Sequence, residues 1–196
     1  MSTMEAKRFA SREEVLEGLK QDRCLVGSDL SGLDLSGIKL IGLNMKGADL
    51  HEANLTGAML CAADLSEVNL SNAHLDGATM YGDSLRGANL RNAHLHAAKV
   101  GGVDLQEADL TGADLSESRI MGVDVTDADF SKVDTTAARA AGVSWSDAKV
   151  QPAELPAAME PPSWLPKLLA GIAVALILMM IMRRIAGKRR SPAEKA

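Results

Sequence analysis

A five-residue repeat covers most of the chain. Residues 28–147 read as 24 consecutive pentads without an insertion, as in Ala48-Asp-Leu-His-Glu52. The third residue of each pentad is Leu, Met, Val, Ile or Phe as far as Phe130, and the first is most often Ala. A period of five fits neither the 3.6 residues of a helical turn nor the 2.0 of a flat strand. It predicts a chain that turns a corner every five residues, so that four pentads close one coil and coils stack about 4.8 Å apart.

The pentads, with the consensus Ala-(Asp/Asn)-Leu-X-X, resemble the pentapeptide-repeat family. The resemblance implies an all-β solenoid, a right-handed quadrilateral β-helix, here of about six coils. A stack of repeats exposes its core at an open end and needs a cap. Ser11-Arg-Glu-Glu14 matches a capping box and predicts a short capping helix over residues 12–20.

Composition divides the chain into five predicted parts. The repeats hold 18 acidic and 8 basic residues, whereas residues 183–196 hold six basic residues and one acidic residue. Pro-rich residues between the repeats and the apolar tail predict an extended linker. The predicted parts are an N-terminal segment with the capping helix (1–27), the β-helix (28–150), the linker (151–163), a transmembrane helix (164–184) and a basic tail (185–196).

One face of the predicted rod differs from the other three when the repeat is aligned every twenty residues. Its outward positions lack Asp and Asn and carry basic and apolar residues, while other faces carry ladders such as Asp29, Asp49 and Asn69. A coherent apolar stripe on a polar solenoid predicts a contact surface. The alternatives are sequence drift in a tolerant repeat and a flatter face whose backbone prefers other residues. The candidate protein-contact residues are Lys39, Ile41, Met59, Cys61, Tyr81, Lys99, Arg119, Met121 and Arg139.

The C-terminal part contains fifteen uninterrupted apolar residues, 168–182. Counted from Leu165, with Lys167 and Arg183 reaching the interface, residues 165–182 are long enough to contact membrane lipid as a single span. Trp164, Lys167, Arg183 and Arg184 are the predicted interface anchors. The basic tail favours repeats outside the cytoplasm, but the N-terminus lacks an apolar secretory signal. We therefore favour a tail anchor in a bacterial inner membrane, with the repeats in the cytoplasm.

The sequence contains no motif of a catalytic or cofactor site. It has no Gly-rich phosphate loop, nucleophile elbow or paired-carboxylate motif, so we expect a non-enzyme without a cofactor. His74 and His94 are twenty residues apart and should stack on adjacent coils, with His96 beside them. Stacked histidines suit zinc or copper, but no complete ligand set accompanies them, and a solvated polar ladder is the favoured interpretation.

These features favour a membrane-anchored protein-interaction scaffold that presents the repeat rod near the membrane surface. The partner is expected to be a protein, nucleic acid is disfavoured, and a homo-oligomer remains an open alternative. The family resemblance implies two other functions. One is an acidic DNA mimic that modulates a type II topoisomerase, and the other is a secreted bacterial effector that inserts into a host membrane.

Overall fold

The computed structural model describes residues 7–21 and 24–159. Residues as far as Ala158 form one compact unit. In the described ranges, no helix is both long enough and apolar enough to span a bilayer. The predicted transmembrane helix at 164–184, its four interface anchors and the basic tail lie outside the described residues.

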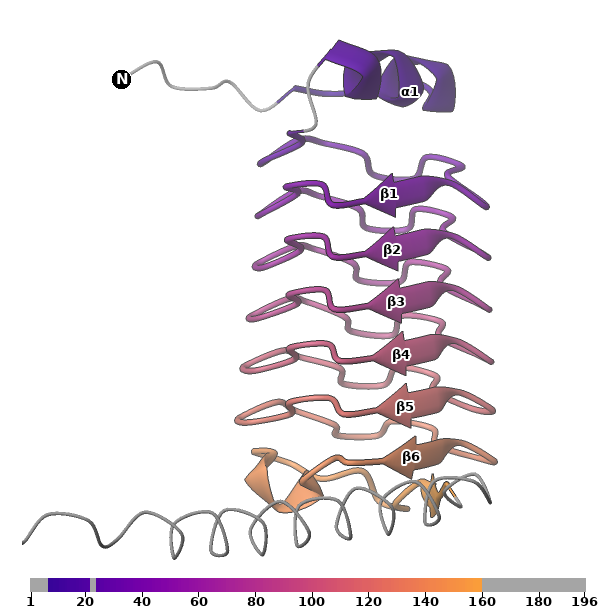
Figure 1. Cartoon of the computed structure of the whole chain (residues 1–196), viewed down its shortest axis with the longest axis vertical. Coiled ribbons are helices and arrows are strands. Elements are labelled where there is room, and N and C mark those ends of the chain that lie inside the picture. Colours follow the sequence, from indigo (N-terminus) through magenta and orange to yellow (C-terminus); the bar gives the residue numbers. More distant parts are fainter. Residues whose placement is uncertain (1–6, 22–23, 160–196) are drawn as a thin grey trace, which may run out of the picture. The chain divides into compact units, whose positions relative to one another are not determined.

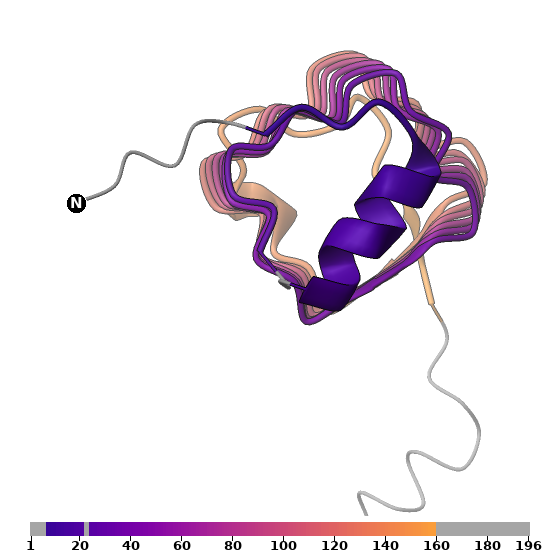
Figure 2. The ribbon, with the colours of Figure 1, turned by 90° about the horizontal axis from the view of Figure 1, so that it is seen from above.

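Helix α1 (Arg12–Gln21) covers the N-terminal end of the stack, as predicted. The Ser11 hydroxyl accepts the Glu14 N–H at 3.2 Å, and the Glu14 carboxylate accepts the Ala10 N–H at 2.9 Å. This reciprocal pair stabilises the helix start because it satisfies N–H groups that have no partner within the helix. Val15 of α1 and Phe9 before it are buried in the core. Seen from above, α1 lies across the opening of a four-sided ring (Figure 2).

The repeats form a parallel β-solenoid with one three-residue strand in each coil (Figure 1). Neighbouring strands pair in a register of twenty residues, as in Leu40↔Leu60, which confirms that four pentads make a coil. The six strands are β1 (Lys39–Ile41), β2 (Met59–Cys61), β3 (Thr79–Tyr81), β4 (Lys99–Gly101), β5 (Arg119–Met121) and β6 (Arg139–Ala141).

The other three sides of each coil are tight turns rather than strands. In a representative turn, the Ala53 N–H donates to the Leu50 carbonyl at 3.1 Å, and Glu52 between them has φ +57°. Isolated parallel bridges such as Asp109↔Asp129 join these sides from coil to coil. A positive φ favours Gly, which has no Cβ, and this explains the many pentads that end in Gly.

The core is a set of columns that run along the stack. The third residues of the pentads point inward and are almost completely buried, and one such column is Leu30, Leu50, Leu70, Leu90, Leu110 and Phe130. Each fully buried Leu contributes about 2 kcal/mol of transfer free energy. At the C-terminal end, Trp145 packs edge-on against Phe130 with ring centroids 5.4 Å apart. The 3₁₀ helix Trp145–Asp147 therefore covers the last coil.

The stack extends beyond the boundary that was predicted at residue 150. Residues 157–158 form β7 (Ala157–Ala158), which pairs in parallel with β6. The Thr135 hydroxyl donates to the Glu154 carbonyl at 2.6 Å, and Pro152 and Pro156 are buried. The first part of the predicted linker thus belongs to the rod, because it supplies a pairing partner for β6.

Candidate protein-contact face

The outward side chains of β1–β6 form one surface, which we call the strand face. Its first column holds the first residue of each strand, and its third column holds the third residue; the middle residues point into the core. The first column is Lys39, Met59, Thr79, Lys99, Arg119 and Arg139. The third column is Ile41, Cys61, Tyr81, Gly101, Met121 and Ala141. All nine predicted contact residues therefore lie on this one face.

The absence of Asp and Asn from the first column has a backbone cause. On the turn sides, the corresponding carboxylate or amide oxygen accepts the N–H two residues later, as Asp109 does from Thr111 at 2.9 Å. On the strand face that backbone pairs with the next strand instead, so a side-chain acceptor is not needed. Missing acid alone therefore does not indicate a binding surface; only the residues that are present on this face can do so.

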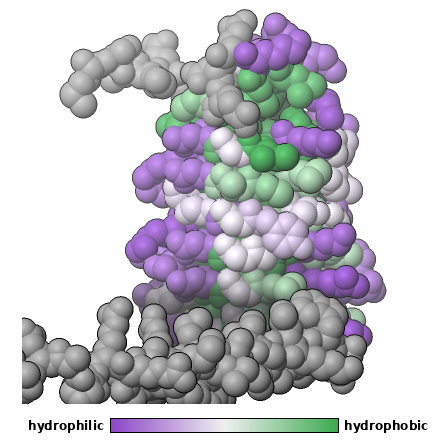
Figure 3. Space-filling view, in the orientation of Figure 1, coloured by the Kyte–Doolittle hydropathy of each residue, from purple (hydrophilic) through white to green (hydrophobic). Residues whose placement is uncertain are grey.

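Large apolar side chains are exposed along the third column. Ile41, Tyr81 and Met121 are 42%, 46% and 50% exposed, and they alternate with the smaller Cys61, Gly101 and Ala141. A Cβ on Gly101 would lie 2.4 Å from Tyr81 Cε1, which shows that the Tyr81 ring lies over Gly101. Figure 3 shows a strip of hydrophobic and near-neutral residues on this face, between hydrophilic margins.

Four exposed cations lie on the same face without an ion pair among the described residues: Lys39, Lys99, Arg119 and Arg139. Several cations on other sides pair with the rod's own acids, as Lys46 does with Glu67 at 3.0 Å and Arg91 with Asp109 at 2.8 Å, whereas Lys132 has no such pair among the described residues. The strand face thus gathers four cations whose charge no direct ion pair compensates in the described part of the chain.

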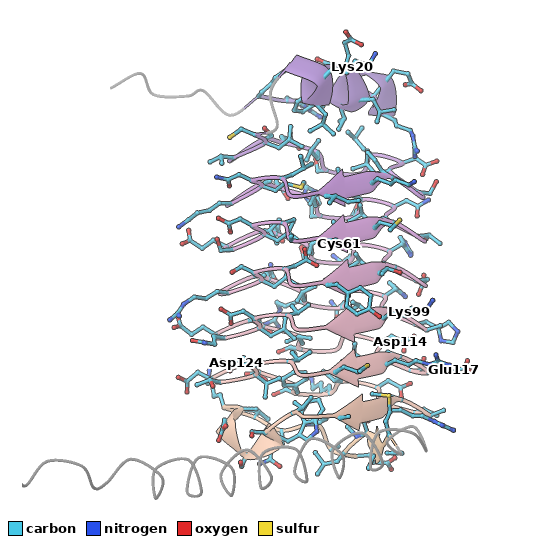
Figure 4. The ribbon with its side chains drawn as sticks, in the orientation of Figure 1. Lys20, Cys61, Lys99, Asp114, Glu117 and Asp124 are labelled. Atoms are coloured by element: carbon cyan, nitrogen blue, oxygen red, sulfur yellow. The ribbon has the colours of Figure 1, made fainter. Side chains whose placement is uncertain are left out.

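The margins of the strand face differ in chemistry. Lys99 and Glu117 lie along one edge, and Asp124 lies beyond the opposite edge (Figure 4). Between the third column and the Asp124 side runs a column of exposed small residues with positive φ, which we call the glycine column: Gly42, Ala62, Gly82, Gly102, Gly122 and Gly142. This column leaves an edge of the strand face without long side chains.

Asp83 is a buried carboxyl at the corner that follows β3. The sequence marks it only as a charged residue at a first position of a pentad. It is 2% exposed, and its Oδ1 accepts the Ala63 N–H at 2.8 Å, while Oδ2 has no hydrogen-bond partner among the described residues. Burial in the apolar core raises the pKa of Asp83 to about 7, and hydrogen bonds from the Ala63 and Tyr81 backbone oppose this shift.

The histidine ladder forms as predicted from the spacing. The rings of His74 and His94 stack with centroids 4.7 Å apart, and the His96 ring nitrogen contacts the Ser116 hydroxyl at 3.0 Å. Across the part of the chain that the structure describes, no group of three or more His, Cys, Asp or Glu side chains is arranged to hold a metal ion. Cys24 and Cys61 are free thiols.

Comparisons with known proteins agree with the repeat architecture. The pentapeptide-repeat family model matches overlapping segments 28–66, 54–92, 63–103 and 101–134. Similar solved structures include a pentapeptide-repeat protein of the Arabidopsis thaliana thylakoid lumen, with 32% identity over 47% of this chain and 68% of that chain, and a TM-score of 0.41.

Two further solved structures are similar. HetL, which is involved in heterocyst differentiation regulation in a Nostoc cyanobacterium, has 28% identity over 65% of this chain and 74% of its own, with a TM-score of 0.29. QnrB1, a plasmid-mediated fluoroquinolone resistance protein, has 15% identity over 76% and 95%, with a TM-score of 0.45. No curated protein sequence matches the chain. Because the family model covers more than half of the 196 residues, the chain belongs to the pentapeptide-repeat family.

Proposed function

We propose that the chain is a non-enzymatic protein-interaction scaffold whose strand face contacts a protein partner. One observation supports this function above the others: exposed apolar side chains and unpaired cations lie side by side on one sheet. Contact surfaces are rich in aromatic residues, Met and Arg, and Tyr81, Met121, Arg119 and Arg139 all lie here. Covering three half-exposed apolar side chains contributes about 1 kcal/mol each.

The proposal includes attachment to a membrane through residues 165–182, with Trp164, Lys167, Arg183 and Arg184 at the interfaces. The described rod supplies a constraint on this attachment. Because β7 ends at Ala158, only residues 159–163 separate the rod from the proposed transmembrane helix. Five extended residues reach at most about 18 Å, so the rod is held close to the bilayer. Fractionation followed by protease digestion of intact cells and of vesicles tests both the attachment and its orientation.

Site-specific photocrosslinking in cells tests the strand face as the contact surface. A photoreactive phenylalanine replaces Tyr81 or Met121 in the full-length chain, and in matched controls it replaces Ser71 or Thr111 on a turn side. We expect a discrete crosslinked species from the two strand-face positions and none from the controls. Crosslinking from the controls alone, or from none of the four positions, would contradict the proposed contact surface.

One observation favours a second candidate, an acidic rod that mimics DNA toward a type II topoisomerase. Paired bridges bring Asp104 beside Asp124 and Asp109 beside Asp129. Hydrogen bonds from Thr126 and Ser131 lower the pKa values of Asp124 and Asp129. Burial opposes the same shift at Asp109, but hydrogen bonds from Thr111 and the contact with Arg91 together lower its pKa. The carboxylates of Asp109, Asp124 and Asp129 are therefore charged at neutral pH, and the acidic ladders are regularly spaced, as phosphates are. A DNA supercoiling assay with the fragment 1–158 tests the DNA-mimic function. Unchanged topoisomerase activity at micromolar concentrations of the fragment would count against it.

A further inference from the structure

The strand face has a geometry that specifies more than a generic protein contact. Three of its cations occupy consecutive strands, because Lys99 pairs with Arg119 and Arg119 with Arg139 in register. They form a column with a spacing of about 4.8 Å. The exposed apolar side chains of Ile41, Tyr81 and Met121 occupy alternate strands of the parallel third column, so they recur about every 9.6 Å.

These spacings are close to those along one side of an α-helix. One helical turn rises about 5.4 Å, and residues seven apart are separated by about 10.5 Å. An amphipathic helix places apolar residues in one stripe and can place acidic residues in a neighbouring stripe. Eighteen helical residues extend about 27 Å, and the distance from β1 to β6 is about 24 Å. The strand face is therefore long enough to accommodate a helix of that length.

The lateral order of the columns also fits a helix. The glycine column beside the third column has no long side chains, so a helix backbone can approach there and rest against Tyr81 and Met121. On the other side, Lys99, Arg119 and Arg139 lack ion pairs within the described chain and are within reach of acidic residues on the same helix. Glu117 shares that edge and disfavours a partner with acid directly opposite it.

We propose that the strand face binds an acidic amphipathic α-helix of a partner protein, which lies along the rod axis. The apolar stripe of that helix covers the third column and the glycine column, and its Asp or Glu residues face Lys99, Arg119 and Arg139. This inference rests on the proposed scaffold function and adds the chemistry and the conformation of the bound segment. Helix-in-groove recognition of this kind uses anchors spaced at three, four and seven residues.

A synthetic peptide tests the charge requirement. The probe is a fluorescein-labelled 18-residue helix with Leu at positions three and four apart on one side and Glu beside them. A matched peptide carries Lys in place of Glu. Anisotropy is measured against the full-length chain in phosphatidylcholine nanodiscs, with empty nanodiscs as background. We expect the Glu peptide to bind at least about tenfold more tightly than the Lys peptide, because three exposed charge pairs together give about that factor.

Charge reversal on the rod should exchange this preference. The triple variant Lys99→Glu, Arg119→Glu and Arg139→Glu should favour the Lys peptide over the Glu peptide. Lys132→Glu is the matched control, because Lys132 lies on another side of the rod and has no ion pair in the described chain. Glu is tolerated there, since Lys132 has a positive φ that Glu52 and Glu107 also adopt. Equal binding of the two peptides, or no binding of the Glu peptide below about 1 mM, overturns the proposal.

The chain's own thiols test the conformation of the bound segment. Cys61 lies in the third column and Cys24 lies off the strand face, and both are partly exposed. In a series of Glu peptides, a chloroacetamide group is placed at one position after another, and mass spectrometry measures how much of each cysteine is alkylated. The yield at Cys61 should peak every three to four peptide positions, and the yield at Cys24 should stay low throughout. A period of two indicates an extended segment and overturns the helix.

Two further outcomes separate this inference from the scaffold function. In the first outcome, the chain binds vesicles that contain 30% phosphatidylserine but binds neither peptide, and the triple variant loses the vesicle binding. This outcome assigns the strand face to a lipid surface and overturns the proposal. If Tyr81 and Met121 crosslink a partner through a segment that is neither helical nor acidic, only the present inference fails. If they crosslink no partner, the scaffold function fails as well.

Discussion

Replacing Asp83 with Ala should stabilise the rod at alkaline pH. The pKa of this buried carboxyl is raised from 3.8 to about 7, chiefly because the apolar core disfavours its charged form. A difference of that size corresponds to about 4 kcal/mol between ionisation in the folded and in the unfolded chain. Ala is also the residue at the equivalent position one coil earlier, Ala63, so the substitution fits the repeat.

The direction of the pH dependence follows from proton binding. Between pH 3.8 and about 7 the folded chain retains the Asp83 proton while the unfolded chain has released it. The free energy of unfolding therefore falls as the pH rises through this window, and the loss is complete above pH 7. Asp83→Ala removes that loss but also removes the hydrogen bonds that the carboxyl accepts from the Ala63 and Tyr81 backbone, which contribute about 1 kcal/mol each.

We therefore expect Asp83→Ala to be about 2 kcal/mol more stable than the parent chain at pH 8, and to lie within about 1 kcal/mol of it at pH 5. Urea unfolding followed by circular dichroism from pH 5 to pH 8 measures this difference, and the histidines cancel because both chains contain them. Asp127→Ala, which removes an exposed carboxyl, is the control. A difference between Asp83→Ala and the parent that stays constant across this range would refute the buried-charge argument.

Three other substitutions test the packing of the rod. Gly101→Ala should lower stability by about 1–2 kcal/mol because its Cβ meets the Tyr81 ring at 2.4 Å; adding Tyr81→Ser should restore most of the loss in urea unfolding. Asp129→Ala should lower the melting temperature more than Asp129→Asn, since the Asn oxygen can still accept the Ser131 N–H at 2.9 Å; equal effects would count against that bond. Trp145→Ala should cost about 3 kcal/mol by uncovering Phe130, and hydrogen exchange should rise in the last coil first.

The sequence alone determined the repeat, its closure and its cap. The central residue of every pentad as far as Phe130 is apolar, and this regularity predicts a coil of four pentads and a period of twenty residues. Ser11 and Glu14 located α1 correctly because capping depends on local hydrogen bonds. The same periodicity placed all nine candidate contact residues on one face, since equal spacing along the chain means stacking along the rod.

Only the tertiary structure decided what that face means. The missing Asp and Asn looked like a functional signal, but strand pairing removes the need for a side-chain acceptor there. Which cations stay unpaired depended on distances such as that between Lys46 and Glu67, which lie 21 positions apart in the sequence. The sequence does not predict the strand at Ala157–Ala158, because the neighbouring prolines argue against a strand. This segment becomes a strand because the open edge of β6 offers it backbone pairing. Local patterns fix local geometry, whereas charge compensation and edge pairing depend on residues that only the fold brings together.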